Sequence, residues 1–278
     1  MDHYQFEAFS VPCDLHIDAP TASAANDAAK AVFENAKRLE QRYSFFTSDS
    51  ELSSLNNRST DRHTLSDELA GLIRLALFYA QITHGTFDIA TAGTLKELSR
   101  AASLDAYALR KEALLPFADS THLNLDGNIL TFSNPVTKID LGGLVKEYAV
   151  DNSILLLQSL GIESAMVNFG GDIAVIGTYY DVPWRVGIQD PNVPDNNLIE
   201  TELNYGAVCT SGHSKRFSLI ESERISHIIA PIKKDDTFAQ ISIHAPTAVD
   251  AGIWSTALLI DPALIPPEHI EIVSTVRL

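Results

Sequence analysis

The order of the expected elements indicates an α+β protein with largely antiparallel sheets and packed helices. Helices come early in the chain, short strands with turns dominate the middle and late parts, and one helix follows a glycine pair. A doubly wound α/β fold would alternate strands and helices throughout, so it fits less well. The 278 residues, 45% of them hydrophobic, suffice for one large domain over residues 1–278, or for two intimately packed lobes.

The early part of the chain predicts one strand and two helices. Residues 4–17 approach strand alternation, with Pro12 as an interruption, and we expect an edge strand there. Residues 22–43 predict a helix, because their apolar side chains share one broad face. Exposed polar residues then surround an aromatic pair, and a short helix follows.

A second long helix is expected at residues 66–83, where leucine, isoleucine and alanine keep the helical period and Gly85 supplies the end. Residues 95–117 have a helical tendency. Residues 123–132 predict a hairpin, because alternating apolar positions flank the turn Asp126-Gly127-Asn128.

The late part predicts strands and a final helix. A strand pair is expected at residues 165–177, hinged at Gly170-Gly171-Asp172. Further strands are expected at residues 183–191, 203–209, 224–231 and 241–246, and an apolar helix at residues 248–260.

The charge balance limits the partners. A formal net charge of −16 argues against binding a nucleic-acid backbone or an anionic membrane surface. A ligand with phosphates would therefore need a local cationic or metal-assisted site. The two cysteines, Cys13 and Cys209, are too few for a disulfide framework, and we expect both to be small buried residues.

The N-terminal residues 1–11 include acidic and aromatic side chains, without a basic start or a long apolar run. This pattern predicts no secretory or lipoprotein signal in the chain as given, and no membrane segment. Cytoplasm is the default location, unless a leader precedes this sequence.

The stretch around which the chain is organised is residues 138–151, where a short apolar run enters Gly142-Gly143 and an amphipathic run follows. We expect strand, tight turn and helix. Such a turn can present backbone N–H groups and a helix N-terminus to an anion, with Lys146 as a charge partner. The alternative is that the glycines only solve the backbone geometry of the turn.

Other candidate residues have the same two interpretations. The Gly170-Gly171-Asp172 turn and the Thr210-Ser211-Gly212 turn could approach a phosphate, or could be ordinary turns. Asp88 could touch a ligand or cap the turn after it. His227 is alone on an apolar strand, where a histidine can be structural or catalytic.

Eight stretches, in the same order, resemble the ApbE family of flavin transferases, which attach FMN from FAD to a Thr or Ser of a target protein. The family pattern of Asp-Leu-Gly-Gly, two residues, Lys, one residue, Tyr-Ala, one residue, Asp is similar to residues 140–151. The other similar stretches are residues 46–56, 85–88, 168–172, 184–191, 210–212, 227–229 and 245–251. Together they cover about residues 43–260.

The resemblance implies an ApbE-like, T-fold-related architecture and a Mg²⁺-dependent site that binds FAD, breaks its pyrophosphate and flavinylates an acceptor protein with release of AMP. The implied catalytic residues are His227 and Lys146. The implied FAD-binding residues are Phe46, Asp88, Gly142, Gly143, Lys146, Tyr148, Gly170, Gly171, Asp172, Thr210, Ser211 and Gly212. Phe46 stands where the family usually has a tyrosine, so stacking on the flavin would survive and a hydroxyl contact would not.

The chain departs from the family at the implied metal site. Thr256 is kept, but Gly252 stands where the family has a metal-binding Asp, and Glu147 replaces a glycine after the lysine. A hard dication loses its anionic ligand in this way. A rebuilt site could use the backbone carbonyl of Val145 or the carboxylate of Asp250, although Asp250 lies about 160° away from position 252 around a helix.

Three hypotheses about function therefore stay open. The chain is an active transferase with a rebuilt metal site, or it is a catalytically weakened relative that binds FAD as a carrier, regulator or partner protein. In the third hypothesis the glycine turns only shape the fold. Release of AMP from FAD would separate the first two.

Overall fold

The main structural unit is an antiparallel sheet. In the computed structural model the described residues are 1–193, 196–213, 217–226, 228 and 238–277. Within them, a seven-stranded sheet has the order β1-β2-β6-β7-β10-β13-β14, and every neighbouring pair is antiparallel. Its strands are β1 (Asp2–Ala8), β2 (Val11–Asp18), β6 (Ser164–Phe169), β7 (Asp172–Ile176), β10 (Tyr205–Gly212), β13 (Phe238–Ala245) and β14 (Glu271–Arg277). The predicted α+β class with antiparallel sheets is confirmed.

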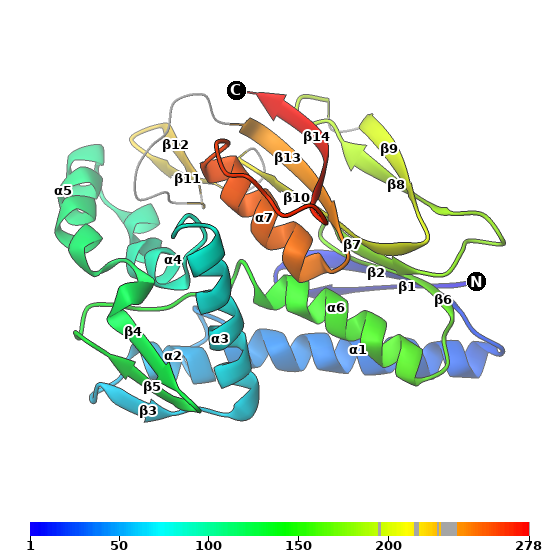
Figure 1. Cartoon of the computed structure of the whole chain (residues 1–278), viewed down its shortest axis with the longest axis horizontal. Helices are drawn as coiled ribbons and strands as arrows, with labels where there is room; N and C mark the ends of the chain where they lie inside the picture. Colours follow the sequence, from blue (N-terminus) through cyan, green and yellow to red (C-terminus); the bar gives the residue numbers. More distant parts are fainter. Residues whose placement is uncertain (194–195, 214–216, 227, 229–237, 278) are drawn as a thin grey trace.

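Three helices cover one face of this sheet (Figure 1). They are α1 (Ala22–Tyr43), α6 (Val145–Ser159) and α7 (Ala248–Ile260). Helix α1 contacts β1 and β2, α6 contacts β6 and β7, and α7 contacts β10 and β13. Helix α7 is buried on nearly every side, as expected for a helix that is apolar all round.

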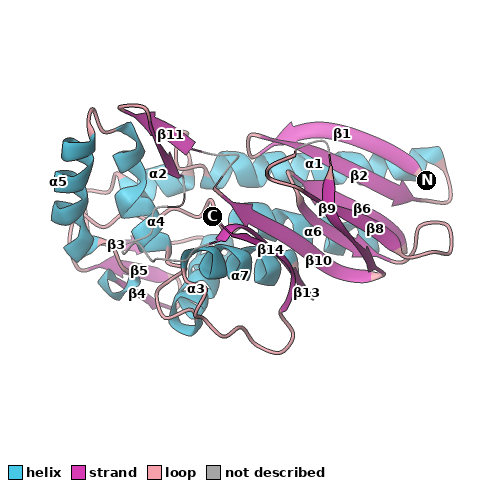
Figure 2. Ribbon diagram, turned by 90° about the horizontal axis from the view of Figure 1, so that it is seen from above, coloured by secondary structure: helices cyan, strands magenta, loops and turns pink. Residues whose placement is uncertain are grey.

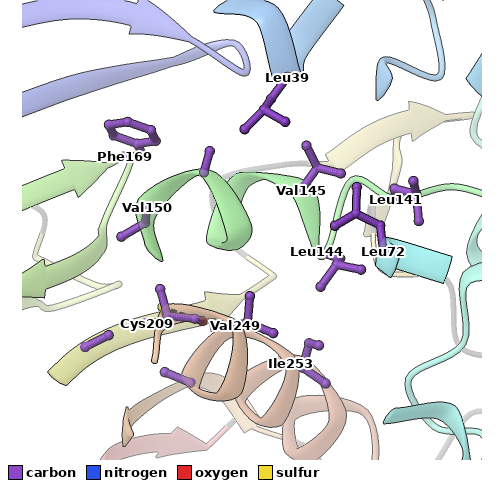
Figure 3. Packing of buried hydrophobic residues seen from close by; sticks show 14 of the residues in the cluster. Leu39, Leu72, Leu141, Leu144, Val145, Val150, Phe169, Cys209, Val249 and Ile253 are labelled. Atoms are coloured by element: carbon purple, nitrogen blue, oxygen red, sulfur yellow. Dashed lines mark hydrogen bonds between the residues drawn. The ribbon is translucent and has the colours of Figure 1, made fainter. Parts of the chain in front are cut away.

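Helix α6 is the centre of the main core. Figure 3 shows its Val145 and Val150 between Leu39 of α1 on one side and Val249 and Ile253 of α7 on the other. All five side chains are buried in one continuous cluster. The position of α6 is therefore fixed by packing on two helices and on the sheet.

The opposite face of the sheet is covered by a hairpin of β8 (Trp184–Gln189) and β9 (Asn197–Leu203). Val175 and Val208 point to this face and form a second cluster with Trp184, whereas their neighbours Ala174 and Ala207 belong to the main core. The period of two along each strand thus separates the two clusters.

The remaining elements lie beyond the ends of α6 and α7, and Figure 2 shows them on the side away from the N-terminus. The helices there are α2 (Glu51–Asn56), α3 (Asp67–Ile82), α4 (Ile89–Leu95) and α5 (Leu104–Leu114), with 3₁₀ turns η1 (Lys96–Arg100), η2 (Leu115–Phe117) and η3 (Ser120–His122). The strands are β3 (Arg62–Thr64), β4 (Leu123–Asp126) and β5 (Ile129–Phe132) in one small sheet, and β11 (Phe217–Ile220) with β12 (Glu223–Ser226) in another.

Most of the predicted elements are confirmed. Helices α1, α3 and α7 and the hairpin around Gly127 lie within a residue of the predicted bounds, and Cys13 and Cys209 are buried. The helical tendency of residues 95–117 is realised as two 3₁₀ turns and α5, which are separate elements. No helix of the described residues is long and apolar enough to span a membrane.

The prediction of one edge strand at residues 4–17 holds for residues 4–8, which lie in the edge strand β1, but the rest of the segment turns back as β2 and completes a hairpin. Phe9 and Ser10 both have positive φ, at 53° and 58°, and they reverse the chain between β1 and β2. Two consecutive left-handed residues are the geometry of a tight hairpin turn. Neither residue is Gly, Asn or Asp, so the sequence carried no turn signal here.

The prediction of a strand before Gly142 is also wrong. Residues 137–141 form no strand, because side chains of other elements bind their backbone. The Asn56 amide donates to the Ile139 carbonyl at 2.7 Å and accepts from the Ile139 N–H at 2.9 Å. The Lys138 N–H donates to the Thr94 hydroxyl at 3.0 Å. Side chains thus satisfy this buried backbone in place of a neighbouring strand.

The predicted turn at residues 210–213 is wrong for its first three residues. Thr210, Ser211 and Gly212 are the end of β10 and pair with Ser242, Ile241 and Gln240 of β13. The small hydroxyl residues resemble turn chemistry locally, but pairing with a strand distant in sequence decides their conformation.

The contact between α4 and residue 139 gives a testable prediction. A Cβ added to Gly93 would stand 2.5 Å from the Ile139 Cα and 2.6 Å from its N. We predict that G93A lowers the free energy of unfolding by roughly 2 kcal/mol or more, because backbone cannot yield as a flexible side chain does. Urea unfolding followed by circular dichroism measures the change.

Gly71, inside α3, offers the matched control because an added Cβ there meets nothing within 4 Å. G71A should raise stability by about 0.5–1 kcal/mol, since alanine restricts the unfolded chain. If G93A behaved like G71A, the close approach of Gly93 to residue 139 would be contradicted.

Candidate functional site

The two glycine turns meet at one lysine. Lys146 lies in the first turn of α6, after Gly142-Gly143, and its Nζ forms an ion pair with Asp172, which follows Gly170-Gly171 at the start of β7. The same Nζ is 3.0 Å from Oε1 of Glu147. The structure thus brings together two stretches that the sequence separates by about 30 residues.

The glycines of these turns differ in their surroundings. A Cβ on Gly170 would collide with the side chain of Val11, so this glycine, with φ of 66°, is needed for packing. Gly171 has φ of 102°, and an added Cβ there would meet nothing within 4 Å. Gly142 and Gly143 are both exposed, and the Gly142 N–H is already bound to the Asp140 carboxylate at 2.9 Å. An added Cβ would meet only an ordinary contact at Gly143 and nothing at Gly171, so both positions have room for a ligand, although the Gly171 N–H is itself bound to the Asn168 side-chain oxygen at 2.8 Å.

Hydroxyl groups gather where β10 meets α7. Ser211 Oγ is 2.8 Å from Ser255 Oγ and 3.1 Å from Thr256 Oγ1. Thr210 points to the other side of the strand, where its hydroxyl is 2.8 Å from that of Ser242. Of the predicted residues in this stretch, Ser211 is thus beside Thr256 and Thr210 is not.

The carboxylate of Asp250 is bound to two hydroxyl groups away from Thr256 and Ser211. It accepts a hydrogen bond from the Tyr79 hydroxyl at 2.5 Å and one from the Thr247 hydroxyl at 2.9 Å. The first bond holds α7 against α3, and the second closes the N-terminal cap of α7. The Asp250 side chain therefore points toward α3, which agrees with the angle of about 160° around the helix between positions 250 and 252.

Asp88 also makes bonds of a structural kind. Its buried carboxylate accepts from the N–H groups of Ala90, Thr91 and Ser120, so it caps α4 and fixes the turn before β4. Tyr148 is half-buried against the main core, and Val145 is buried there. His227 lies outside the described residues.

Phe46 is an exposed aromatic ring with two cations beside it. Its side chain is 65% exposed, and Lys96 Nζ and Arg100 Cζ each lie 5.5 Å from the ring centroid. Lys96 also pairs with Asp140 at 2.6 Å, and Asp140 holds the Gly142 N–H. This chain of contacts connects Phe46 to the glycine pair. Lys96 and Arg100 could not be predicted from the sequence as part of this site, because only the tertiary structure turns them toward Phe46.

The charges around Lys146 are unbalanced. The side chains of Lys146, Glu147 and Asp172 are 14%, 9% and 7% exposed, and one ammonium group faces two carboxylates. Oε2 of Glu147 is buried and has no hydrogen-bond partner among the described residues. A buried, uncompensated carboxylate is costly, and a cation bound there would offset the cost.

These residues fit a divalent cation that prefers oxygen ligands. The donors at hand are a carboxylate with one unused oxygen and the hydroxyls of Ser211 and Thr256. Within the described part of the chain, three or more His, Cys, Asp and Glu side chains nowhere gather in a metal-binding group. Any cation would thus have a mixed ligand set with few charges.

A further acid, Asp151, is one turn beyond Glu147 on α6. Its carboxylate accepts from the N–H groups of Ala248 and Val249, at 2.7 Å and 3.0 Å, and so caps α7. Burial raises its pKa from 3.8 to about 6, and the charges of Asp250 and Glu147 add to this effect while the two N–H groups oppose it.

Comparison with known proteins agrees with this geometry. A model of the ApbE family matches residues 9–268. The FAD:protein FMN transferase of Vibrio cholerae is 32% identical over 203 residues, which are 70% of this chain and 60% of that protein, so the match spans less than two thirds of its length. The FAD:protein FMN transferase of Treponema pallidum is 27% identical over 86% of this chain and 72% of its own. The crystal structure of the ApbE protein of Thermotoga maritima superposes with a TM-score of 0.84 at 25% identity, over 93% of this chain and 86% of that chain.

The raised pKa of Asp151 predicts a dependence of stability on pH. Between about pH 4 and pH 6 the folded chain keeps a proton that the unfolded chain releases, so the contribution of Asp151 is fully present below about pH 4 and is lost as pH rises through about 6. D151N removes this contribution. We expect its stability relative to the parent to rise by about 2.5 kcal/mol from pH 4 to pH 7, which corresponds to a pKa moved from 3.8 to about 6.

Urea unfolding of both proteins at a series of pH values, in EDTA, measures this difference. EDTA removes any contribution of a bound cation. A difference between D151N and the parent that stays constant from pH 4 to pH 7 would contradict the raised pKa.

Proposed function

The chain belongs to the ApbE family, and on this premise we propose that it is an FAD:protein FMN transferase. In the proposed reaction a Ser or Thr hydroxyl oxygen of an acceptor protein attacks the FMN phosphorus of FAD. A new P–O bond to the acceptor forms, the pyrophosphate P–O bond breaks, and AMP leaves with the electron pair. The hydroxyl proton is released, so that atoms and charge balance.

One observation carries this proposal: two glycine turns meet at the single, nearly buried ammonium of Lys146. A pyrophosphate needs close approach to backbone and a positive charge, and exposed Gly143 and open Gly171 supply the first. Lys146 supplies the second. Because Glu147 and Asp172 already pair with this ammonium, the proposal needs a bound cation beside Lys146 to hold the phosphates.

Phe46 is the proposed support for the flavin ring. It is exposed, it is linked through Lys96 and Asp140 to the glycine pair, and a flat aromatic ligand can stack on it. Lys96 and Arg100 add positive charge at the same place, although the chain as a whole carries −16. This provides the local cationic site that an acidic protein needs for a phosphate-containing ligand.

Mg²⁺ is part of the proposal. When bound, such an ion neutralises charge that develops on the phosphates during transfer. The hydroxyls of Thr256 and Ser211 lie 3.1 Å apart and are proposed to face it. His227 and Lys146 remain the proposed catalytic residues, and the backbone carbonyl of Val145 remains a proposed ligand. Asp250 would have to leave Tyr79 and Thr247 to serve as one.

The first prediction is enzymatic. Incubated with FAD, Mg²⁺ and a total bacterial protein extract as acceptor pool, the chain should release AMP, measured by chromatography, and should produce protein bands that keep flavin fluorescence after denaturing electrophoresis. EDTA should abolish both. FAD binding without AMP and without labelled protein would instead support an FAD-binding carrier or regulator.

The second prediction concerns the flavin support. F46A should weaken FAD binding about three- to tenfold, because it removes a stacking surface worth roughly 0.5–1.5 kcal/mol, whereas F46Y should bind like the parent. Quenching of flavin fluorescence measures the affinity. F78A, which truncates an exposed phenylalanine on α3, is the control and should leave the affinity unchanged. Equal affinities of F46A and F78A would count against this role of Phe46.

A further inference from the structure

Glu147 occupies the space over a glycine of another helix. A Cβ added to Gly252 of α7 would collide with the Glu147 side chain, with Cδ at 3.2 Å and Oε1 at 3.3 Å and Cγ closer still. Glu147 belongs to α6, so its side chain crosses the α6–α7 interface. Gly252 is therefore the residue that makes room for this carboxylate.

The end of the Glu147 side chain is only partly satisfied. Oε1 pairs with Lys146 at 3.0 Å, and Lys146 is shared with Asp172. Oε2 is buried and has no hydrogen-bond partner among the described residues. A carboxylate held in this way loses its hydration without regaining it, unless a further cation binds.

Hydroxyl groups lie on the same face of α7. Thr256 follows Gly252 by four residues, so the two positions are neighbours on the helix surface, and Ser211 touches Thr256 at 3.1 Å. A carboxylate oxygen over Gly252 and a hydroxyl at Thr256 form a donor set suited to a hard dication. Asp250, on the far side of the helix, is bound to Tyr79 and Thr247.

We infer that Glu147 is the anionic ligand of the divalent cation in this chain. Its carboxylate reaches the site from α6 over Gly252, in place of an Asp side chain at position 252 of α7. Oε1 keeps its bond to Lys146, and Oε2 binds the cation beside Thr256. Glu147 and Gly252 act as an exchanged pair, in which the glycine of one helix accommodates the acid of the other. The inference rests on the proposed function for the phosphate ligand, but metal binding can be measured without flavin transfer.

The test is a titration with Mn²⁺, which replaces Mg²⁺ and whose free form is counted by electron paramagnetic resonance, without and with FAD. E147Q keeps the size of the side chain and removes its charge. We expect it to weaken Mn²⁺ binding by at least about tenfold, because even outer partners of metal ligands are worth that much. E163Q changes an exposed acid after α6 and should bind like the parent.

A double variant tests the exchange itself. E147G/G252D removes the carboxylate of α6 and places one on α7 at position 252, so it should bind Mn²⁺ within about threefold of the parent. E147G alone has neither carboxylate and should bind Mn²⁺ as weakly as E147Q. G252D alone should be less stable, because its side chain would collide with Glu147. Circular dichroism confirms that each variant is folded.

Three results would overturn the inference: no Mn²⁺ binding by the parent in either titration, an E147Q variant that binds like the parent, or a folded E147G/G252D that binds no better than E147G. AMP release from FAD is measured on the same protein preparations after the bacterial protein extract has been added as acceptor pool. If Mn²⁺ binds through Glu147 and no AMP appears, the proposed function fails and the inference stands. If AMP appears and E147Q leaves metal affinity unchanged, the inference fails and the proposed function stands.

Discussion

The amide side chain of Asn56 bonds to both the N–H and the carbonyl of Ile139, and the arrangement of the site depends on this pair of hydrogen bonds. They hold an extended segment that has no neighbouring strand, and the Thr94 hydroxyl binds the N–H and the carbonyl of Lys138, the residue before Ile139. Because the segment runs directly into Gly142-Gly143 and α6, its fixed course sets where the helix begins. Losing either bond would leave a buried backbone group without a partner, at a cost of about 1–3 kcal/mol.

The packing of α6 then fixes the positions of the polar side chains at the start of this helix. The helix is held between α1, α7 and the sheet by apolar contacts, so the polar residues of its first turn cannot move away from their neighbours (Figure 3). Lys146 meets Asp172, and Glu147 reaches over Gly252. The resulting excess of buried negative charge has a cost in free energy that favours binding of a cation. Apolar packing thus keeps in place a charge arrangement that would relax in water.

The candidate site was predictable where neighbours in sequence are also neighbours in space. The glycine turns, Lys146 and Ser211 follow from local pattern, and the resemblance supplied Thr256. For Asp88 the structure shows the capping alternative, since its carboxylate caps α4, whereas the carboxylate of Asp250, a candidate metal ligand, binds Tyr79. The two departures from the family, an acid gained at Glu147 and an acid absent at Gly252, were both visible in the sequence.

The sequence by itself determined the long helices, the hairpin at Gly127 and the α+β class, because helical period, caps and turn residues act over a few neighbours. It did not determine the turn at Phe9-Ser10, the unpaired segment at Ile139 or the strand course of Ser211. In each case a contact with residues distant in sequence overrides local preference. The same holds for Glu147 and Gly252: they are more than a hundred positions apart, and only the packing of α6 on α7 puts the carboxylate of one into the space left by the other.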